Sequence, residues 1–367
     1  MPVLISLTLI SNCGILNEFY LGGKMQSLSK ALQQILSSKK VAFIVHQKAD
    51  ADALCAMMAL KLLVKKRKEH KVAPTIDLFT DTEKVPENCL PLVAHASINK
   101  QRYKKYDLAV SLDCASLSRL GRFQDIFNNA KHTIVIDHHD TCEKFGENNI
   151  LRVVSSVCEI LYHELVMKRR WKVTSEICRL VYSGIITDTN DLTQNVHQST
   201  HQVIADLMEK DECLGLELET LRNHFFKNSS KQQISLLQRA LKSLQFFEND
   251  QIAIMKIFKQ DLTETGCGQE DTLGIVDYAL KMKGVYIGVI FIKQEDNSYY
   301  VSLRSKDNID VSCVAKHFNG GGHFNVAAFQ SSEPLAELKL ELIAKCKEQL
   351  GIFEPHNLIA DLFDEEL

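Results

Sequence analysis

The chain has 367 residues, of which 45% are hydrophobic and 24% are charged, and this length is typical of two globular domains rather than one. Its 43 basic and 46 acidic side chains give a formal net charge of −3, which argues against a protein that holds long nucleic acid on a broad positive surface. The 11 cysteines occur singly, without a CxxC pair, so we expect reduced thiols in a cytoplasmic protein.

The first 24 residues are apolar and differ in character from the rest of the chain. They lack the positively charged start of a signal peptide, and the apolar run is too short and too interrupted to cross a bilayer. We interpret residues 1–24 as an extension ahead of Met25, which is an alternative translation start, and we expect no membrane attachment. A membrane-associated segment is the less favoured alternative.

From Lys40 to about Asp191, short apolar runs alternate with segments of helical periodicity. Strands are predicted at 41–46, 75–79, 108–112 and 133–136, and the first long helix at 53–66. This alternation favours an α/β domain with a parallel sheet. In such sheets ligands bind beyond the carboxyl ends of the strands.

After the predicted strands, helices are predicted at 154–168, 174–187 and 198–210, followed by a polar helical connection at 217–245. Beyond this connection the sequence indicates a further, smaller α/β domain. Its strands are predicted at 251–258, 285–292 and 298–305, and its helices at 312–317 and 334–350. The predicted organisation is a first domain over 25–212, a helical linker over 213–245, a glycine-rich domain over 246–350 and a tail over 351–367.

Four separate segments place His or Asp where a buried element meets a loop. They are VAFIVHQKADADAL with His46, Asp50 and Asp52, YDLAVSLDCAS with Asp113, TIVIDHHD with Asp137, His138 and His139, and SGIITDTND with Asp188. Each segment alone is weak, because a DxD pair more often forms a turn or a helix cap, and a His pair is more often surface or core. Together, at the ends of predicted strands, they indicate a two-metal site.

Carboxylates and imidazoles suit Mn²⁺, and carboxylates suit Mg²⁺, whereas the lack of thiolates at these points makes zinc the less natural ion. Asp50 and Asp52 are two residues apart and can point to neighbouring metals, and Asp113 could bridge them. Two metals roughly 3.5–4 Å apart can clamp a phosphoryl group and generate hydroxide at neutral pH. The expected chemistry is therefore hydrolysis of a phosphate ester or anhydride.

Over about Met25 to Gln330 the chain closely resembles the DHH phosphoesterase superfamily, specifically its short-chain branch of nanoRNA exonucleases that also dephosphorylate 3′-phosphoadenosine 5′-phosphate (pAp). The resemblance rests on the four motifs and on VSLRS and GGGHFNVAAF in the second half. It implies two Mn²⁺ ions, with Mg²⁺ or Co²⁺ as alternatives. The implied ligands are His46, Asp50 and Asp113 for one ion, and Asp52, Asp113, His138 and Asp188 for the other.

The resemblance also assigns roles around the metals. It implies that His139 is the active-site histidine near the scissile phosphate and that Asp137 orients it. The family's first motif usually reads HxxPDxDAxGS, whereas Ala49, Cys55 and Ala56 stand here in place of Pro, Gly and Ser. Because all three ligands of this motif remain, we expect the differences to affect substrate positioning more than metal binding.

The glycine cluster at 320–322 can let a ligand approach the backbone and can expose amide groups to anionic oxygens, although an isolated GGG more often only makes a tight turn. The resemblance implies that the second domain binds the phosphate and nucleotide of the substrate across a cleft that holds the active site between the domains. The residues concerned are Arg304, Gly321, Gly322 and His323.

We therefore expect a two-metal phosphoesterase that acts on short oligoribonucleotides, including nanoRNA and the dinucleotide pApA, and on pAp. One alternative is a phosphodiesterase dedicated to linear dinucleotides from cyclic di-AMP turnover, and another is a non-catalytic nucleotide-binding relative. Pyrophosphate is disfavoured because pyrophosphatases of the superfamily lack the GGGH domain. The expected partners are short RNA oligonucleotides and nucleotides, with a homodimer left open.

Overall fold

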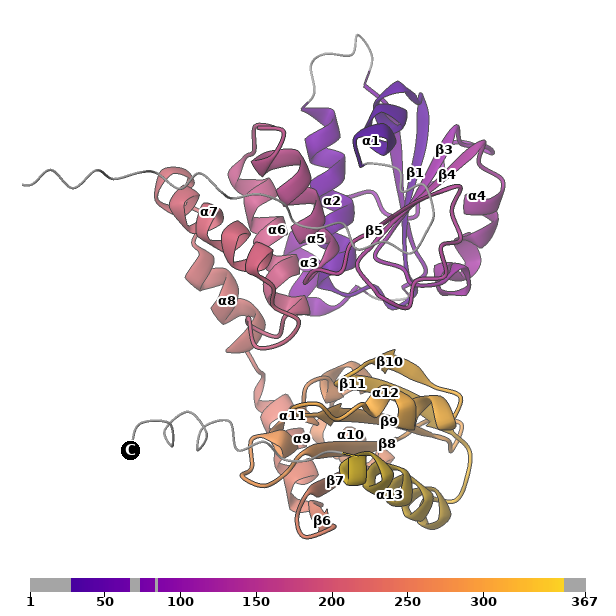
Figure 1. Cartoon of the computed structure of the whole chain (residues 1–367), viewed down its shortest axis with the longest axis vertical. Coiled ribbons are helices and arrows are strands. Elements are labelled where there is room, and N and C mark those ends of the chain that lie inside the picture. The colour runs from indigo at the N-terminus through magenta and orange to yellow at the C-terminus, as the bar shows by residue number, and fades with distance from the viewer. Residues whose placement is uncertain (1–27, 67–72, 83–84, 353–367) are drawn as a thin grey trace, which may run out of the picture. The chain divides into compact units, whose positions relative to one another are not determined.

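The computed structural model describes residues 28–66, 73–82 and 85–352 (Figure 1). The predicted extension over 1–24 and nearly all of the predicted tail lie outside the described residues. The chain divides into two compact units with the boundary between Lys227 and Asn228. The stretch predicted as a helical linker, 213–245, contains α8 (Leu218–Phe226) in the first unit and α9 (Lys231–Lys242) in the second.

The first unit is built on a five-stranded parallel sheet with the strand order β2-β1-β3-β4-β5 (Figure 1). The strands are β1 (Lys40–Val45), β2 (Thr75–Thr80), β3 (Leu108–Leu112), β4 (His132–Asp137) and β5 (Asn148–Leu151). The inner strands are almost wholly buried because both faces of the sheet are covered, which explains their continuous apolar runs. The prediction of a parallel α/β sheet is confirmed, whereas the short edge strand β5 was not predicted.

Helices cover both faces of this sheet (Figure 1). Val41 and Phe43 of β1 point into a core shared with α1, α2, α5 and α6, while Ala42 and Ile44 point into a second core shared with α4. The helical elements are α1 (Leu28–Ser37), α2 (Ala51–Lys65), η1 (Glu87–Cys89), α3 (Leu90–Val93), η2 (Leu117–Phe123), α4 (Gln124–Asn128), α5 (Val157–Leu161), the π-helical turn η3 (Tyr162–Met167), α6 (Ser175–Asp188), α7 (Gln198–Leu214) and α8.

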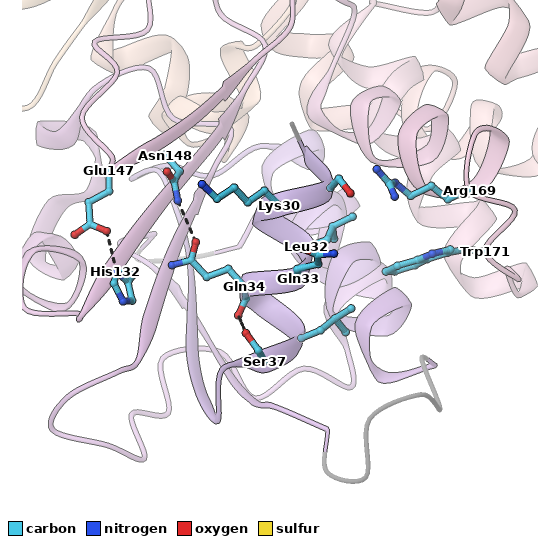
Figure 2. A pocket seen from close by; sticks show the side chains of 12 residues that line it. Lys30, Leu32, Gln33, Gln34, Ser37, His132, Glu147, Asn148, Arg169 and Trp171 are labelled. Atoms are coloured by element: carbon cyan, nitrogen blue, oxygen red, sulfur yellow. Dashed lines mark hydrogen bonds and ion pairs between the residues drawn. The ribbon is translucent and has the colours of Figure 1, made fainter. Parts of the chain in front are cut away.

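A pocket of about 800 Å³ lies beside α1 (Figure 2). Its lining includes His132 and Asn148 from the amino-terminal ends of β4 and β5, together with Trp171. Asn148 Nδ2 donates to Gln34 Oε1 of α1 at 3.0 Å, and His132 pairs with Glu147 at 3.0 Å (Figure 2). This pocket is therefore at the amino edge of the sheet, the edge opposite to the one where the strands deliver the His and Asp motifs.

The second unit is a mixed six-stranded sheet with the order β10-β11-β9-β8-β7-β6, in which only β7 and β8 pair in parallel (Figure 1). The strands are β6 (Gln245–Phe247), β7 (Ile252–Ile257), β8 (Ile287–Lys293), β9 (Tyr299–Ser305), β10 (Gly321–His323) and β11 (Val326–Ser331). Strands β8 and β9 form an antiparallel pair, while β10 and β11 were not predicted as strands.

The helices of the second unit also cover both faces of their sheet. One face, with Val301 and Leu303, packs on α12 and α13, and the other, with Ala253 and Met255, packs on α9 and α11. The elements are α9, α10 (Lys259–Thr265), η4 (Gln269–Thr272), α11 (Asp277–Leu280), α12 (Val311–His317) and α13 (Leu335–Ile352). Among the described helices of both units, none is long and apolar enough to cross a membrane.

Candidate metal centre

The structure brings all the predicted His and Asp residues of the first unit together at the carboxyl edge of the parallel sheet. They come from the ends of three adjacent strands and from two helix ends. His46 follows β1, Asp50 and Asp52 begin α2, Asp113 follows β3, Asp137, His138 and His139 close β4, and Asp188 ends α6.

Two groups of side chains have a geometry that can hold cations. In the first, one ligand atom from each of His46, Asp50 and Asp113 lies within 4.8 Å of the others, and the same is true of Asp52, His138 and Asp188 in the second. A third combination, Asp113 with His138 and His139, meets the same limit.

Asp113 lies between the first two groups. Its Oδ2 is 3.8 Å from His46 Nε2, and its Oδ1 is 3.4 Å from His138 Nε2. The ring of His46 is also 3.6 Å from Asp50 Oδ2, and that of His138 is 3.3 Å from Asp188 Oδ2. One carboxylate therefore presents an oxygen to each group, which is the arrangement that a bridging ligand requires.

The backbone around Asp113 supports this placement. Asp113 has φ +54°, a left-handed conformation that aspartate tolerates better than most residues, and its backbone N donates to Ile136 O at 3.0 Å. The turn thus keeps Asp113 tied to β4 just where the chain leaves β3.

The histidines are oriented through their Nδ1 atoms. His46 Nδ1 lies 2.8 Å from Gln47 O, and His138 Nδ1 lies 3.1 Å from Val154 O. Because a carbonyl oxygen only accepts, Nδ1 donates in both cases, and the neutral ring then carries its lone pair on Nε2. In both residues Nε2 is the atom that faces the carboxylates.

The carboxylates create a strong preference for positive charge. Burial alone would lower the pKa of His46, but the carboxylates of Asp113 and Asp50 outweigh it and raise this pKa to about 10. Burial, assisted by the charge of Asp113, raises the pKa of Asp52 to about 7, and burial raises the pKa of Asp188 well above its usual range. Burial thus disfavours the charged forms of Asp52 and Asp188, and a cation bound among the carboxyls would favour their ionised forms.

In the first two groups, two buried carboxylate oxygens accept no hydrogen bond from the described part of the chain, Asp113 Oδ1 and Asp188 Oδ2. The nearby thiols do not compete as ligands, because burial raises the pKa of Cys158 well above its usual range and that of Cys114 to about 12. The available donors are carboxylate oxygens and imidazole nitrogens. This set fits divalent ions such as Mn²⁺.

The local packing depends on a glycine in α6. A Cβ added to Gly184 would lie 2.4 Å from Cys158 Sγ and 2.6 Å from Asp52 Oδ1. Only glycine therefore lets α6 approach α2 and α5 closely enough to place Asp188 beside His138. The first motif also differs from the family pattern at Ala49, whose backbone N donates to Thr82 Oγ1 at 2.7 Å, a bond that proline could not make.

Two features near the site were not assigned from the sequence. Arg119 in η2 places Nη2 3.3 Å from His46 Nδ1, and its backbone O accepts from Gln47 N at 2.7 Å. The segment 154–158 touches both His138 and Asp52. Both features arise where segments distant in the sequence meet.

The predicted substrate residues belong to the second unit, where they lie on neighbouring strands. Arg304 of β9 and His323 of β10 both align with Val326 of β11 across the sheet. The Nε atom of Arg304 is 3.2 Å from Asp277 Oδ1, and its Nη1 donates to Ser302 Oγ at 3.1 Å. The guanidinium is therefore held in a defined position.

The three glycines of this cluster differ in whether the fold leaves room for a side chain at their position. A Cβ on Gly320 would lie 2.3 Å from Ala328 O, and one on Gly322, where φ is +144°, would lie 2.3 Å from Val326 O. By contrast, no described atom lies within 4 Å of a Cβ added to Gly321. The fold thus requires glycine at 320 and 322, whereas Gly321 borders open space.

Comparison with known proteins decides the family. Residues 40–185 match the DHH family, N-terminal domain, and residues 249–351 match the DHHA1 domain. The chain belongs to the DHH/DHHA1 phosphoesterases. Phosphoesterases of this family depend on metal ions, in agreement with the His/Asp cluster.

Relatives of this phosphoesterase include named enzymes. It is 26% identical to the probable bifunctional oligoribonuclease and PAP phosphatase NrnA of Streptococcus mutans, over 85% of this chain and 96% of that protein. It is 21% identical to the cyclic-di-AMP phosphodiesterase PdeA of Listeria monocytogenes, over 86% of this chain and 49% of that one. The chain spans less than half of the length of several other curated relatives.

A solved structure shares the fold of this DHH/DHHA1 protein. It is the exopolyphosphatase-related protein from Bacteroides fragilis, with a TM-score of 0.76 and 19% identity, and the match covers 88% of this chain and 94% of that chain.

Proposed function

We propose that the protein is a metal-dependent hydrolase of short oligoribonucleotides and of pAp, with water as the attacking group. The observation that carries this proposal is the pair of His/Asp groups joined by Asp113. Such a pair matches the chemistry of phosphate ester hydrolysis better than a role in binding alone.

In this proposal the two groups are the ligand sets of two ions. His46, Asp50 and Asp113 hold one, and the other is held by Asp52, Asp113, His138 and Asp188. Two bound ions would clamp the phosphoryl group, make water a competent nucleophile at neutral pH and stabilise the leaving oxygen. Mn²⁺ is the expected ion because the sets mix imidazole with carboxylate, and Mg²⁺ and Co²⁺ are alternatives.

His139 is the protein group proposed to contact the scissile phosphate. Its Nδ1 donates to Asp137 Oδ1 at 2.8 Å, which fixes the orientation of the ring. Asp137 is fully buried at the end of β4 and is proposed to orient His139. In this proposal His139 contacts the phosphate, Asp137 orients His139, and neither residue is a metal ligand.

The second unit is proposed to bind the rest of the nucleotide. Arg304 offers a charged donor to a phosphate, and the amides of Gly321 and Gly322, together with His323, complete the anion site. The open space beside Gly321 leaves room for such a ligand. The name of the streptococcal relative, an oligoribonuclease and PAP phosphatase, supports this substrate class.

A second candidate function is hydrolysis restricted to linear dinucleotides from cyclic di-AMP turnover. It is favoured by the similarity to the listerial cyclic-di-AMP phosphodiesterase, which extends over 86% of this chain. The two candidates share the metal chemistry and differ only in how much substrate the second unit accepts.

The test is a time course with Mn²⁺ on labelled RNAs of 2, 5 and 20 nucleotides, with pAp as competitor. The proposal predicts rapid hydrolysis of the 2-mer and 5-mer, much slower hydrolysis of the 20-mer, and competition by pAp, because a net charge of −3 gives little binding energy for long strands. Hydrolysis of pApA without release of phosphate from pAp favours the dinucleotide enzyme. Processive degradation of the 20-mer at a comparable rate would overturn both.

A further inference from the structure

The segment 154–158, which leads from β5 into the first two residues of α5, contacts two of the proposed ligands of one ion. The carbonyl of Val154 accepts from His138 Nδ1 at 3.1 Å. The backbone N atoms of Val157 and Cys158, in the first turn of α5, donate to the two carboxylate oxygens of Asp52 at 2.7 and 3.1 Å. The position of this short segment therefore sets the direction of both ligands.

Glu159 fastens the segment from the other side. Its side chain is almost fully buried, and its Oε2 accepts from the backbone N of Ser155 at 3.2 Å and from the Ser155 hydroxyl. Its own backbone N donates at 3.0 Å to Ser156 Oγ, the N-cap of α5. One residue thus holds the turn that precedes α5 through both its side chain and its backbone.

The same carboxylate is anchored to α7. Ser199 Oγ donates to Oε1 at 2.5 Å, and Thr200 Oγ1 donates to Oε2 at 2.7 Å. Both hydroxyls are in the first turn of α7, where Thr200 also accepts from the backbone N of His197 at 3.0 Å. Glu159 therefore joins the start of α7 to the segment that directs His138 and Asp52.

We propose that Glu159 is a positioning residue for the metal centre: by pinning segment 154–158 to α7, it fixes the tautomer of His138 and the carboxylate of Asp52. This inference rests on the proposed function, because it assumes that His138 and Asp52 bind a cation. A buried carboxylate is a poor way to gain stability alone, since its removal from water offsets the hydrogen bonds it makes. Its effect on ligand geometry gives it a specific role, as outer partners of metal ligands do.

Asp206 is a matched control residue, because it also links α7 to the helical segment that follows α5. Asp206 of α7 accepts from Tyr162 of η3 at 2.7 Å and pairs with Lys210 at 2.6 Å. Asp206→Asn weakens a polar link between α7 and the helix that continues α5, yet within the described residues Asp206 forms no hydrogen bond or ion pair with segment 154–158. If Glu159 contributed only to stability and had no role at the metal centre, variants at Glu159 and Asp206 should affect Mn²⁺ binding equally.

The experiment measures the number and affinity of bound Mn²⁺ by calorimetric titration of the full chain, for the wild type, Glu159→Ala, Glu159→Gln and Asp206→Asn. We expect one of two Mn²⁺ sites to weaken by roughly 10- to 100-fold in Glu159→Ala. Glu159→Gln should recover much of this affinity, because its amide oxygen can still accept from Ser155 N. Asp206→Asn should keep both sites.

The outcomes separate the two proposals. A wild type that binds fewer than two Mn²⁺ ions and does not hydrolyse pAp or short RNA overturns the proposed function, and this inference with it. A wild type with two Mn²⁺ sites, both retained at full affinity in Glu159→Ala, overturns this inference alone. If Glu159→Ala does not fold, the double variant Ser155→Ala/Ser199→Ala takes its place, because it keeps the carboxylate and removes two of its donors. Full Mn²⁺ affinity at both sites in that folded double variant equally overturns the inference.

Discussion

Asp137 holds His139 through a 2.8 Å hydrogen bond from Nδ1 to Oδ1, and the same oxygen accepts from the backbone N of His138 at 3.0 Å. The two bonds tie the His-His pair to the last residue of β4, inside the sheet. The orientation of His139 is therefore set by the fold before any substrate binds.

Asp137→Asn should slow turnover without loss of metal. The amide weakens the charge-assisted bond to His139 Nδ1, and we expect kcat on pAp to fall by roughly 10- to 100-fold. Both Mn²⁺ ions should remain, because Asp137 is in neither proposed ligand set. Steady-state kinetics and a Mn²⁺ titration check the two statements, and loss of one ion would place Asp137 among the ligands instead.

Asp52→Ala should remove activity and also lower stability. We expect turnover to fall by at least about a hundredfold, the scale of several kcal/mol that a metal contributes to a transition state. Because Asp52 also accepts from the start of α5, loss of this cap should cost about 1 kcal/mol and lower Tm by a few degrees.

Asp107→Ala is the matched control for that variant. Asp107 accepts from Lys40 N at 3.0 Å and pairs with Lys131 at 2.8 Å, just before β3 and away from the carboxyl edge. It should lower Tm with turnover unchanged. Near-normal Mn²⁺-dependent activity in Asp52→Ala would remove the two-metal interpretation.

Removal of divalent ions should destabilise the first unit. Asp50, Asp52, Asp113 and Asp188 crowd together, so a bound cation stabilises the native state alone. Mn²⁺ at about 100 times its Kd should add about 2.7 kcal/mol, which corresponds to a rise in Tm of roughly 5–10 °C over the chelated protein. Thermal melts with Mn²⁺ and with EDTA measure this difference. It should shrink in Asp188→Asn, and equal melting temperatures in the wild type would contradict it.

Arg304→Ala should weaken substrate affinity rather than slow the chemical step. Loss of a phosphate contact through a charged donor is worth about 1.5–3 kcal/mol, so KM for pAp and short RNA should rise roughly 10- to 100-fold. A small phosphodiester without a nucleotide should be hydrolysed nearly as before. Arg304→Lys, which keeps the charge but not the fork, should be intermediate. An equal fall on both substrates would assign Arg304 to the chemical step.

The arrangement of the His and Asp motifs could be predicted because it depends on a simple rule of topology. His46, Asp113 and Asp137 each follow an apolar run, and the carboxyl ends of parallel strands meet at one edge of a sheet. The structure places these residues together, while their roles as ligands or catalytic groups stay predictions.

Other features could not be predicted from local patterns. The strand β5 has the sequence Asn-Asn-Ile-Leu, with a single fully buried residue, so it carries too little periodicity to be recognised. The glycine-rich strand β10 looks like a turn in sequence and is a strand only through its pairing with β11. Glu159 reads as an ordinary helical glutamate until α7 folds over it, because two of the residues that donate to its carboxylate, Ser199 and Thr200, belong to α7.

The wide spacing of the site along the chain has a consequence for how the protein is made. His46 and Asp188 are separated by most of the first unit, and β1 lies in the sheet between β2 and β3. Non-local pairings of this kind form slowly, since long loops must close before the strands gain their contacts. A nascent chain therefore lacks Asp188, and with it the second proposed ligand group, until α6 has left the ribosome, whereas His46, Asp50 and Asp113 are all synthesised earlier. The two proposed groups are thus completed at different stages of synthesis, and the second only after most of the first unit has been made.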